Sequence, residues 1–308
     1  MSEASPFIGV VTVLYNSDEV LEDFFSSLAV QEGIRYRLYV IDNGTTDSGT
    51  RLSEAQAARH GIDAVCIFNN ANLGVAKGNN QGIEKALADG CTHVLLANND
   101  TAFAPRTIAL LLDAMRESGS AAATPKILYH GQPDLLWYAG GHTSPWAGYS
   151  VHHGDMSVDK GQFDQQMYTD YAPTCFMMLA RRVFDVVGMM DELYFVYFDD
   201  TDFVWRMKQK GLGILFVPGS VVLHKVSTST GGSLSPFTMY YVNRNRLYFI
   251  LKNFRGLHRL VALAYYVATR PLRLVLLPRK TARQGWRGVL EGIRLSSAVL
   301  RHRTGGGR

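Results

Sequence analysis

Cysteine is scarce in this sequence of 308 residues, and its spacing excludes two structural classes. Cys66, Cys91 and Cys175 are odd in number and include no CxxC pair. A disulfide framework needs paired cysteines, and a cysteine-based zinc site needs closely spaced ones, so neither is expected. Each cysteine stands among apolar or small residues, which predicts buried free thiols in a reducing compartment.

The glycine-rich signatures of common nucleotide-binding folds are also missing. No GxxxxGK[ST] P-loop occurs, and no GxGxxG follows the first apolar run. Because these motifs wrap backbone N–H groups around phosphates, P-loop ATPases and enzymes with a Rossmann dinucleotide site are disfavoured.

Long hydrophobic runs are absent as well. A bilayer-spanning helix needs ~20 apolar residues, and the nearest candidate, residues 260–278, is interrupted by Arg270, Pro271 and Arg273. The first apolar run has no basic region before it, which argues against a secretion signal. We therefore expect a cytoplasmic protein.

Acidic residues are almost missing from the end of the chain. Residues 252–308 contain 13 Lys and Arg but one acid, Glu291, whereas residues 1–251 contain 18 basic and 26 acidic residues. Arginines alternating with Leu, Val and Tyr favour a helix at an anionic membrane surface over nucleic-acid binding. A solvated basic face on a packed helix is the alternative.

The first hundred residues alternate apolar runs with amphipathic ones. This pattern predicts strands over 7–16, 37–44, 63–70 and 93–100, with helices over 17–31, 48–61 and 78–90. Strand–helix alternation is typical of an open, mostly parallel sheet with helices on both faces, so the fold class is α/β.

Polar residues follow each predicted strand: Tyr15-Asn16, Asp42-Asn43-Gly44, Asn69-Asn70 and Asn98-Asn99-Asp100. One such ending is a turn signal. Because parallel strands end at one edge of the sheet, four endings predict a polar rim where ligands bind.

Beyond residue 100 the pattern is more varied. It predicts a helix over 104–120, then loops or a short antiparallel excursion over 129–165 with exposed histidines. A strand and a helix ending at Gly188 follow, then a helix begins in "FDDTDF", and "GILFVPGSVVLHK" indicates strand, turn and strand. The chain is helical and basic from Pro236. We divide it into a domain of residues 1–235 and a helical region of residues 236–308.

The segment "NLGVAKGNNQG" spaces Gly74, Gly78 and Gly82 four residues apart. Such spacing suits close packing of a helix. The interpretation we favour is a loop and helix start whose N–H groups and Lys77 face phosphates.

Three aspartates, Asp199, Asp200 and Asp202, stand between aromatic residues in "YFVYFDDTDFVW". An acidic first helical turn is one explanation. The aromatic neighbours favour a partly desolvated site instead, and His224 and Asp100 each follow a predicted strand. Carboxylates and an imidazole bind divalent cations that bridge phosphates, and a spare carboxylate can act as a general base.

Seven motifs in a fixed order carry a resemblance to a known family. They are "VTVLYNS", "VIDNGTTD", "NLGVAKGNNQGI", "LLANNDT", "FMMLARRVFDVVGMMDELYFVYFDDTDFVWRMKQKG", "VPGSVVLHK" and "YYVNRNRLYFILKN", between residues 7 and 253. The chain resembles family 2 inverting glycosyltransferases, most of all rhamnosyltransferases and galactofuranosyltransferases. The resemblance implies a GT-A fold, a mostly parallel central sheet flanked by helices, with a basic helical extension.

The same resemblance implies a nucleotide-sugar site. Asp42 matches the residue that hydrogen-bonds the pyrimidine base, and Tyr15 lies where the base packs. The positions expected to bind the donor are Tyr15, Asp42, Asn43, Asn72, Gly74, Lys77, Asn80, Asn98 and Asn99.

For the chemistry, Asp200 matches the catalytic base, and Asp199 is expected to orient the acceptor. Asp100 and His224 match ligands of a divalent metal, Mg²⁺ or Mn²⁺, although Asn98 replaces the usual first aspartate of that motif. The expected acceptor contacts are Trp205, Arg206 and Asp202, the last of which also braces the helix start.

The function implied is transfer of L-rhamnose from dTDP-rhamnose to a polysaccharide or lipid-linked glycan at the inner face of the plasma membrane. A galactofuranosyltransferase using UDP-galactofuranose is the first alternative. A non-catalytic scaffold on a degenerate fold is the second, and it is disfavoured because Asp200 and His224 are both retained. Nucleic acid is not an expected partner.

Overall fold

The first half of the chain alternates strands and helices, as the hydrophobic pattern predicts. The computed structural model describes residues 6–16, 18–226 and 234–305. The elements up to residue 97 are β1 (Phe7–Leu14), a 3-10 turn η1 (Asp18–Val20), α1 (Leu21–Ala29), β2 (Arg35–Asp42), α2 (Ser48–His60), β3 (Ala64–Phe68), α3 (Val75–Ala88) and β4 (His93–Ala97).

The second half adds short strands and further helices. They are β5 (Thr101–Phe103), α4 (Thr107–Ser118), β6 (Ala122–Tyr129), β7 (Gln132–Tyr138), β8 (Gly141–Ser144), β9 (Tyr149–His152), β10 (Met167–Thr169), β11 (Phe176–Ala180), α5 (Arg181–Val187), η2 (Glu192–Tyr194), α6 (Asp199–Gln209), β12 (Ile214–His224), α7 (Pro236–Asn253), α8 (Gly256–Val275) and α9 (Arg279–Gly305).

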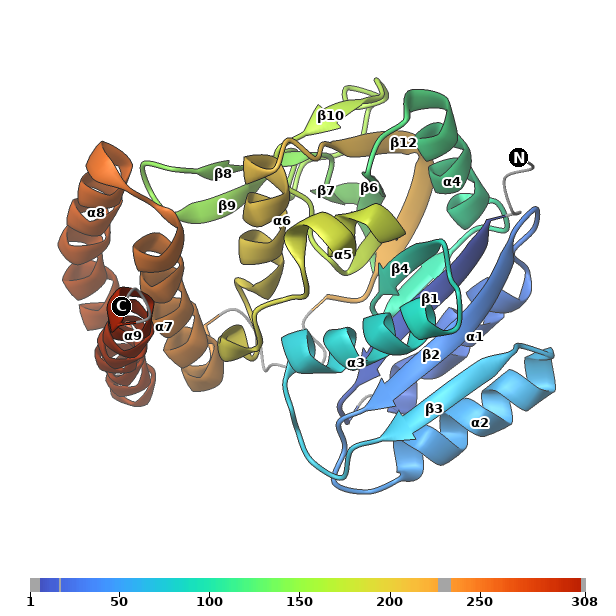
Figure 1. Ribbon diagram of the computed structural model, residues 1–308, viewed down its shortest axis with the longest axis horizontal. Coiled ribbons are helices and arrows are strands. Elements are labelled where there is room, and N and C mark those ends of the chain that lie inside the picture. The colour runs from blue at the N-terminus through green and yellow to red at the C-terminus, as the bar shows by residue number, and fades with distance from the viewer. Residues whose placement is uncertain (1–5, 17, 227–233, 306–308) are drawn as a thin grey trace.

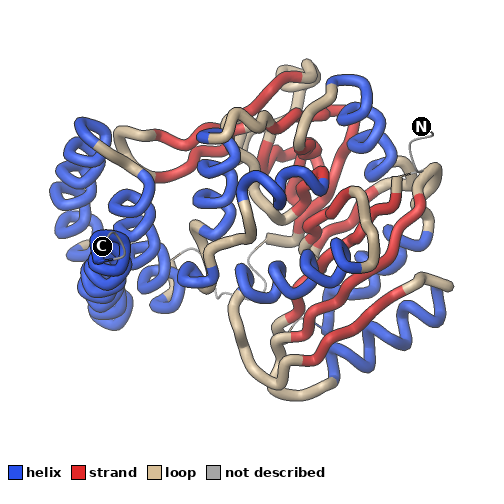
Figure 2. Tube along the Cα trace, in the orientation of Figure 1, coloured by secondary structure: helices blue, strands red, loops and turns tan. Residues whose placement is uncertain are grey.

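One mixed sheet runs through the described residues, in the order β10-β12-β6-β11-β4-β1-β2-β3. The strands β4, β1, β2 and β3 are parallel, whereas β11 runs antiparallel to both β4 and β6. Helices flank the sheet (Figure 2). The predicted α/β architecture is confirmed, and the parallel part places the ends of β1, β2 and β4 at one edge.

Two glycines of the "NLGVAKGNNQG" segment serve close packing. A Cβ on Gly82 would lie 2.3 Å from Cγ1 of Val11 on β1, and one on Gly78 would lie 2.8 Å from Val13. Glycine at both positions therefore lets α3 pack directly on the central strand. Of the two sequence interpretations, packing is correct for these two residues.

Two regions differ from the sequence interpretation. The segment predicted as strand, turn and strand is the single strand β12, in which a register shift between Val217 and Val221 accommodates Pro218-Gly219. Residues 129–165 do form an antiparallel excursion, but His152 is not exposed. Its ring lies against Trp137, Tyr138 and Tyr171.

The helices α7, α8 and α9 gather at the end of the molecule away from β3 (Figure 1). The hairpin β8–β9 reaches towards them, and Trp146 at its turn lies 4.5 Å from His258, ring centre to ring centre. A second apolar cluster joins α7 to the body through Tyr194, Tyr248 and Phe249. Among the described residues, no helix has the length and apolarity needed to span a membrane.

Candidate functional site

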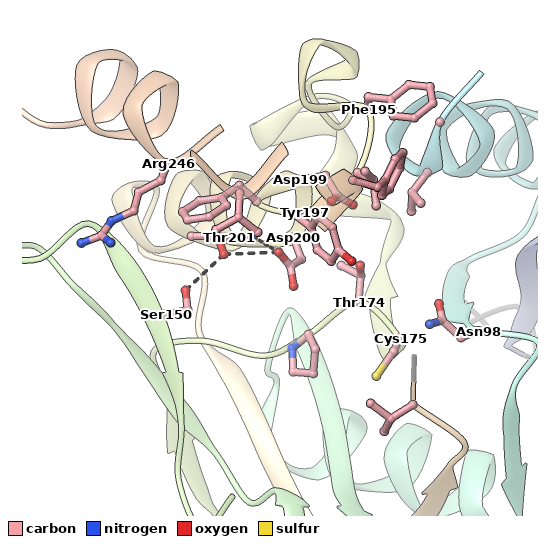
Figure 3. A pocket seen from close by; sticks show the side chains of 18 of the residues that line it. Asn98, Ser150, Thr174, Cys175, Phe195, Tyr197, Asp199, Asp200, Thr201 and Arg246 are labelled. Atoms are coloured by element: carbon pink, nitrogen blue, oxygen red, sulfur yellow. Dashed lines mark hydrogen bonds between the residues drawn. The ribbon is translucent and has the colours of Figure 1, made fainter. Parts of the chain in front are cut away.

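A cavity of about 1140 Å³ opens where the parallel strands end. Tyr15, Asn43 and Asn98-Asn99-Asp100, which follow β1, β2 and β4, line it, so part of the predicted polar rim forms one wall. Asn69-Asn70, which follow β3, do not line it. Asp199 and Asp200 line another part (Figure 3). Residues of α7 and α8 line the far end. The cavity therefore lies between the strand edge, the start of α6 and the C-terminal helices.

Asparagine side chains fix the loop at the strand edge. Asn43 Nδ2 donates to the Gly74 carbonyl at 3.0 Å, and Asn43 Oδ1 accepts from Asn69 Nδ2 at 2.8 Å. The Gly74 N–H donates to Asn72 Oδ1 at 3.0 Å. Gly74 has φ 83°, and a Cβ there would lie 2.6 Å from the Phe195 carbonyl oxygen. Only glycine permits this close approach of two backbones.

Asp42 is buried just behind the rim and does not line the cavity. Its Oδ1 accepts from the Gly44 N–H at 2.8 Å, and its Oδ2 accepts from the Thr50 N–H at 2.8 Å and Thr50 Oγ1 at 2.9 Å. The carboxylate thus shapes the loop between β2 and α2.

Lys77 and Asn80 also lie outside the cavity lining. Asn80 exchanges two 3.0 Å hydrogen bonds with the backbone of Met190, and its Nδ2 also donates to Glu192 Oε1 at 3.1 Å. Lys77 Nζ lies 3.9 Å from Glu192 Oε2. Here Asn80 holds the segment before η2 against α3.

Asp100 and His224 meet at the end of β4 and β12. Asp100 Oδ1 lies 3.2 Å from His224 Nε2, yet Oδ1 has no aligned hydrogen-bond partner among the described residues. Trp137 packs edge-on against the imidazole, 4.7 Å between ring centres. Burial alone would raise the pKa of Asp100, but His224 and Lys225 hold that pKa below its usual value.

Asp200 stands at the start of α6 with defined partners. Tyr171 Oη donates to Asp200 Oδ2 at 2.6 Å, and the Thr201 N–H donates to Oδ1 at 2.6 Å. Burial and the charge of Asp200 raise the pKa of Tyr171 far above its usual value, so this phenol remains a donor. Thr201 is in turn linked to Ser150 on β9, 3.2 Å away (Figure 3).

Asp199 lies beside Asp200 at the start of α6. Burial, then the charge of Asp200, raises the pKa of Asp199 from its ordinary value of 3.8 to about 8. Asp199 therefore keeps its proton at neutral pH. A protonated carboxyl can donate a hydrogen bond to a ligand in the cavity.

The three residues expected at the acceptor do not line the cavity. Asp202 is fully buried and accepts from Arg206 Nε at 2.8 Å, while Arg206 also donates to the carbonyls of Val187 and Met189. Trp205 packs against Phe254 in the second apolar cluster. All three are occupied in joining α6 to its neighbours.

The segment leading into α6 has an unusual backbone. Phe195, Tyr197 and Phe198 have φ of 64°, 61° and 65°, a conformation that costs of order 1–3 kcal/mol for each such residue. Asn245 on α7 holds it: its Nδ2 donates to the carbonyls of Tyr194, Val196 and Tyr197 at 2.8, 2.7 and 2.9 Å. One buried amide thus fixes the turn that presents Asp199 and Asp200.

Comparisons with known proteins identify the family to which this chain belongs. The family model described as glycosyl transferase family 2 matches residues 9–188, more than half of the chain. The chain belongs to this family. It is 28% identical over 247 residues to an N-acetylglucosaminyl-diphospho-decaprenol L-rhamnosyltransferase of Mycobacterium tuberculosis, covering 72% of this chain and 77% of that one. It is 22% identical over 230 residues to the dTDP-rhamnosyl transferase RfbF of Shigella flexneri, covering 70% of each.

Solved structures of other glycosyltransferases share the fold. The mannosyltransferase PcManGT of Pyrobaculum calidifontis, in complex with GDP-Man and Mn²⁺, is 13% identical and aligns over 96% of this chain and 87% of its own with a TM-score of 0.58. GalNAc-T7 with UDP, GalNAc and Mn²⁺ is 16% identical and aligns over 89% of this chain and 52% of its own with a TM-score of 0.67. The GT-A fold is thereby confirmed, and this glycosyltransferase is an enzyme.

Sequence reasoning missed several residues that form this site. Ser150 stands in a stretch without a clear period, and Tyr171 follows that stretch, so no local pattern marked either residue. Asn245 and Arg246 lie in "YYVNRNRLYFILKN", a motif to which no role was assigned. The one signal that could have marked them is that they are polar residues among the aromatic residues of this helix.

We expect Asp199→Asn to flatten the pH dependence of stability. The folded protein keeps the Asp199 proton until about pH 8, whereas an unfolded chain releases it near pH 4. The contribution is therefore fully present below about pH 4 and is lost as pH rises to about 8, by at most about 1.4 kcal/mol per pH unit. Asparagine has no proton to lose in this range. The melting temperature of the wild type should therefore fall relative to that of the variant as the pH rises from about 5 to 8.

Melting curves of both proteins across this range provide the test. Asp185→Asn, which alters an exposed carboxyl on α5, is the matched control and should follow the wild type. A constant difference between Asp199→Asn and wild type at every pH would contradict the raised pKa.

We expect Asn245→Leu to destabilise the fold by about 2–4 kcal/mol, because three carbonyls of the turn lose their donor in a buried site. Urea unfolding measures the loss. Gln209→Leu, which replaces an exposed amide at the end of α6, should leave the midpoint unchanged. Equal midpoints for Asn245→Leu and wild type would show that the turn does not need this clamp.

Proposed function

We propose that this glycosyltransferase transfers L-rhamnose from dTDP-rhamnose to a hydroxyl of a polysaccharide or lipid-linked glycan, with inversion at the anomeric carbon. The observation that carries the proposal is the shared cavity. It brings Asp200 together with Asp100, His224 and the asparagine rim.

The choice of sugar rests on the relatives. The names of two of them specify rhamnosyl transfer, and one names dTDP-rhamnose chemistry. One name also describes a sugar on a diphospho-decaprenol, which supports a lipid-linked acceptor. UDP-galactofuranose remains the alternative donor.

Asp100 and His224 fit a divalent metal. Their facing atoms are 3.2 Å apart without an aligned hydrogen bond, and neighbouring ligands of an octahedral Mg²⁺, each at ~2.1 Å, stand ~3 Å apart. No three His, Cys, Asp or Glu side chains gather as a metal site within the described parts of the chain. Donor phosphates and water would complete the ligands, as is usual for Mg²⁺. The metal, Mg²⁺ or Mn²⁺, would offset negative charge on the leaving diphosphate.

In the proposed reaction the acceptor oxygen attacks the anomeric carbon of the donor sugar. Its proton passes to Asp200, whose carboxylate Tyr171 and Thr201 hold in place. The bond from the anomeric carbon to the phosphate oxygen breaks, and the nucleoside diphosphate leaves. Asp199, which keeps its proton at neutral pH, donates a hydrogen bond to the acceptor.

Nucleotide binding is the first test of the donor. A thermal-shift series with dTDP, UDP, GDP and NAD, each with and without Mg²⁺ or Mn²⁺, should show metal-dependent stabilisation that is largest for dTDP. A ligand at about 100 times its dissociation constant adds about 2.7 kcal/mol. A larger effect of UDP would transfer the proposal to galactofuranose. No response to any nucleotide would instead favour a scaffold on a degenerate fold.

The role of Asp200 is tested by Asp200→Asn. A general base contributes about 10²–10⁴ in rate, so turnover should fall by at least about a hundredfold while dTDP still stabilises the protein. Asp185→Asn is the control and should turn over like the wild type. Full activity of Asp200→Asn would remove Asp200 from the base role.

The outer face of α8 supports contact with an anionic membrane leaflet on the cytoplasmic side. Its exposed apolar residues recur at helical spacing and include Leu257, Leu260, Val267, Leu272 and Val275. Exposed basic residues of α9 follow: Arg279, Lys280, Arg283 and Arg287. Apolar insertion beside basic charge is the composition of interfacial helices.

Removing α8 and α9 would be a poor test, because α9 packs closely on α7: a Cβ on Gly288 would lie 2.2 Å from the Tyr240 carbonyl oxygen. We instead expect the double variant Leu260→Glu, Leu272→Glu to sediment less with phosphatidylglycerol liposomes at an unchanged melting temperature. Val186→Glu changes an exposed apolar residue of the body and should sediment like the wild type. Equal sedimentation of all three proteins would count against the membrane contact.

A further inference from the structure

Two buried arginines line the end of the cavity formed by the C-terminal helices. Arg246 on α7 is 3% exposed and Arg270 on α8 is 6% exposed. In Figure 3, Arg246 lies on the opposite side of Asp200 from Asn98. The catalytic machinery proposed above uses neither arginine. We call Arg246 and Arg270 the arginine pair.

The charge of Arg246 is poorly balanced by its surroundings. Its guanidinium carbon lies 4.8 Å from the ring centre of Tyr149 and 5.5 Å from those of Tyr265 and Tyr266. Its Nη2 donates to the Ala147 carbonyl at 2.6 Å, but its Nε has no hydrogen-bond partner in the described part of the chain. It forms no ion pair with a described acidic residue. Aromatic faces and one carbonyl leave a buried cation under-compensated.

The two guanidinium groups of the arginine pair also repel each other. Burial, then the charge of Arg270, lowers the pKa of Arg246 to about 10. Arg270 is oriented by Asn243, whose Oδ1 accepts from Arg270 Nη1 at 3.2 Å. Arg246 is thus a cation buried beside open space and close to a second cation, which is costly unless an anion reaches it.

The wall next to the arginine pair is apolar. Leu274, Leu276 and Leu277 line the cavity at the end of α8, and the exposed apolar face of the same helix begins beside them. A ligand that satisfies both features has an anionic head with several oxygens and an apolar tail. Guanidinium groups bind phosphate oxygens through paired hydrogen bonds, which suits such a head.

We propose that the arginine pair binds the phosphate or diphosphate group that joins a lipid to the acceptor sugar. The lipid would leave the cavity past Leu274, Leu276 and Leu277 towards the exposed face of α8. This placement would set the sugar beside Asp200, between the lipid anchor and the donor. The inference rests on the proposed function, since it assigns the acceptor of the same site.

The test uses the full-length protein and geranyl diphosphate, a short prenyl diphosphate, as the probe. Titration calorimetry is done with dTDP and Mg²⁺ already saturating, so that the donor site is filled. Wild type should bind the probe, and Arg246→Gln and Arg270→Gln should each weaken binding at least about tenfold, a typical loss for charged hydrogen bonds. Arg283→Gln, an exposed arginine of α9, is the matched control and should bind like the wild type.

Two further ligands separate the possible sources of the anion. Geraniol, which has the tail alone, and inorganic pyrophosphate, which has the head alone, should each bind more weakly than geranyl diphosphate. Pyrophosphate binding as tightly would overturn the lipid-linked assignment. Unchanged probe binding by both arginine variants, or no probe binding by wild type, would overturn the site itself.

The dTDP titration keeps this inference separate from the proposed donor. Both variants should bind dTDP like the wild type, which also shows that they are folded. Loss of dTDP binding in a variant that melts like the wild type would place the arginine in the donor site and overturn the inference. Failure of wild type to bind dTDP would count against the proposed function, and the probe would then be titrated alone to judge the arginine pair.

Discussion

The buried carboxylate of Asp202 holds the catalytic side of this glycosyltransferase together. Its Oδ1 accepts from Tyr194 Oη at 3.1 Å, Asn253 Nδ2 at 2.8 Å and Lys252 Nζ at 2.7 Å, and its Oδ2 accepts from Arg206. Burial alone would raise the pKa of Asp202, but Lys252 and Arg206 hold that pKa below its usual value. The ion therefore joins the start of α6, the turn before it and the end of α7.

This junction explains how three aspartates coexist between aromatic residues. Asp202 is charged and matched by two cations, so its burial is compensated. Asp200 is only partly buried and receives donors from Tyr171 and Thr201. Asp199, buried without a cation, keeps its proton instead. Protonation of Asp199 and ion pairing of Asp202 thus limit the repulsion among the three carboxyls, and Asp199 and Asp200 line the cavity.

The parts of the structure that depend on local sequence were predictable. Apolar runs that end in polar residues identified β1, β2 and β4 and the rim at their ends. This was possible because about ten consecutive residues contain both the apolar pattern of the strand and the polar residues that end it. The roles of Asn80 and Arg206 were not predictable. A motif shows which residues share a helix, but it does not show which face of that helix is covered by a segment from elsewhere in the chain. Asn80 turns to Met190, and Arg206 turns to Val187 and Met189. Tyr171 and Asn245 depend on contacts 29 and about 50 residues away.

The region matched by the family model does not contain all of the residues of the candidate site. The matched region ends at residue 188 and supplies every strand of the sheet except β12, as well as the asparagine rim and Asp100. The carboxyls of α6, His224 and the arginine pair all lie beyond it. Asn245 on α7 fixes the turn that presents Asp200, while its neighbour Arg246 lines the far end of the cavity. The C-terminal helices therefore line the site, and the helix that holds the turn before Asp200 also bounds the far end of the cavity. If Asp200 is the base and the far end holds the acceptor, as proposed, a change in α7 would alter catalysis and acceptor binding together, whereas the strand rim that is proposed to bind the donor would be unaffected.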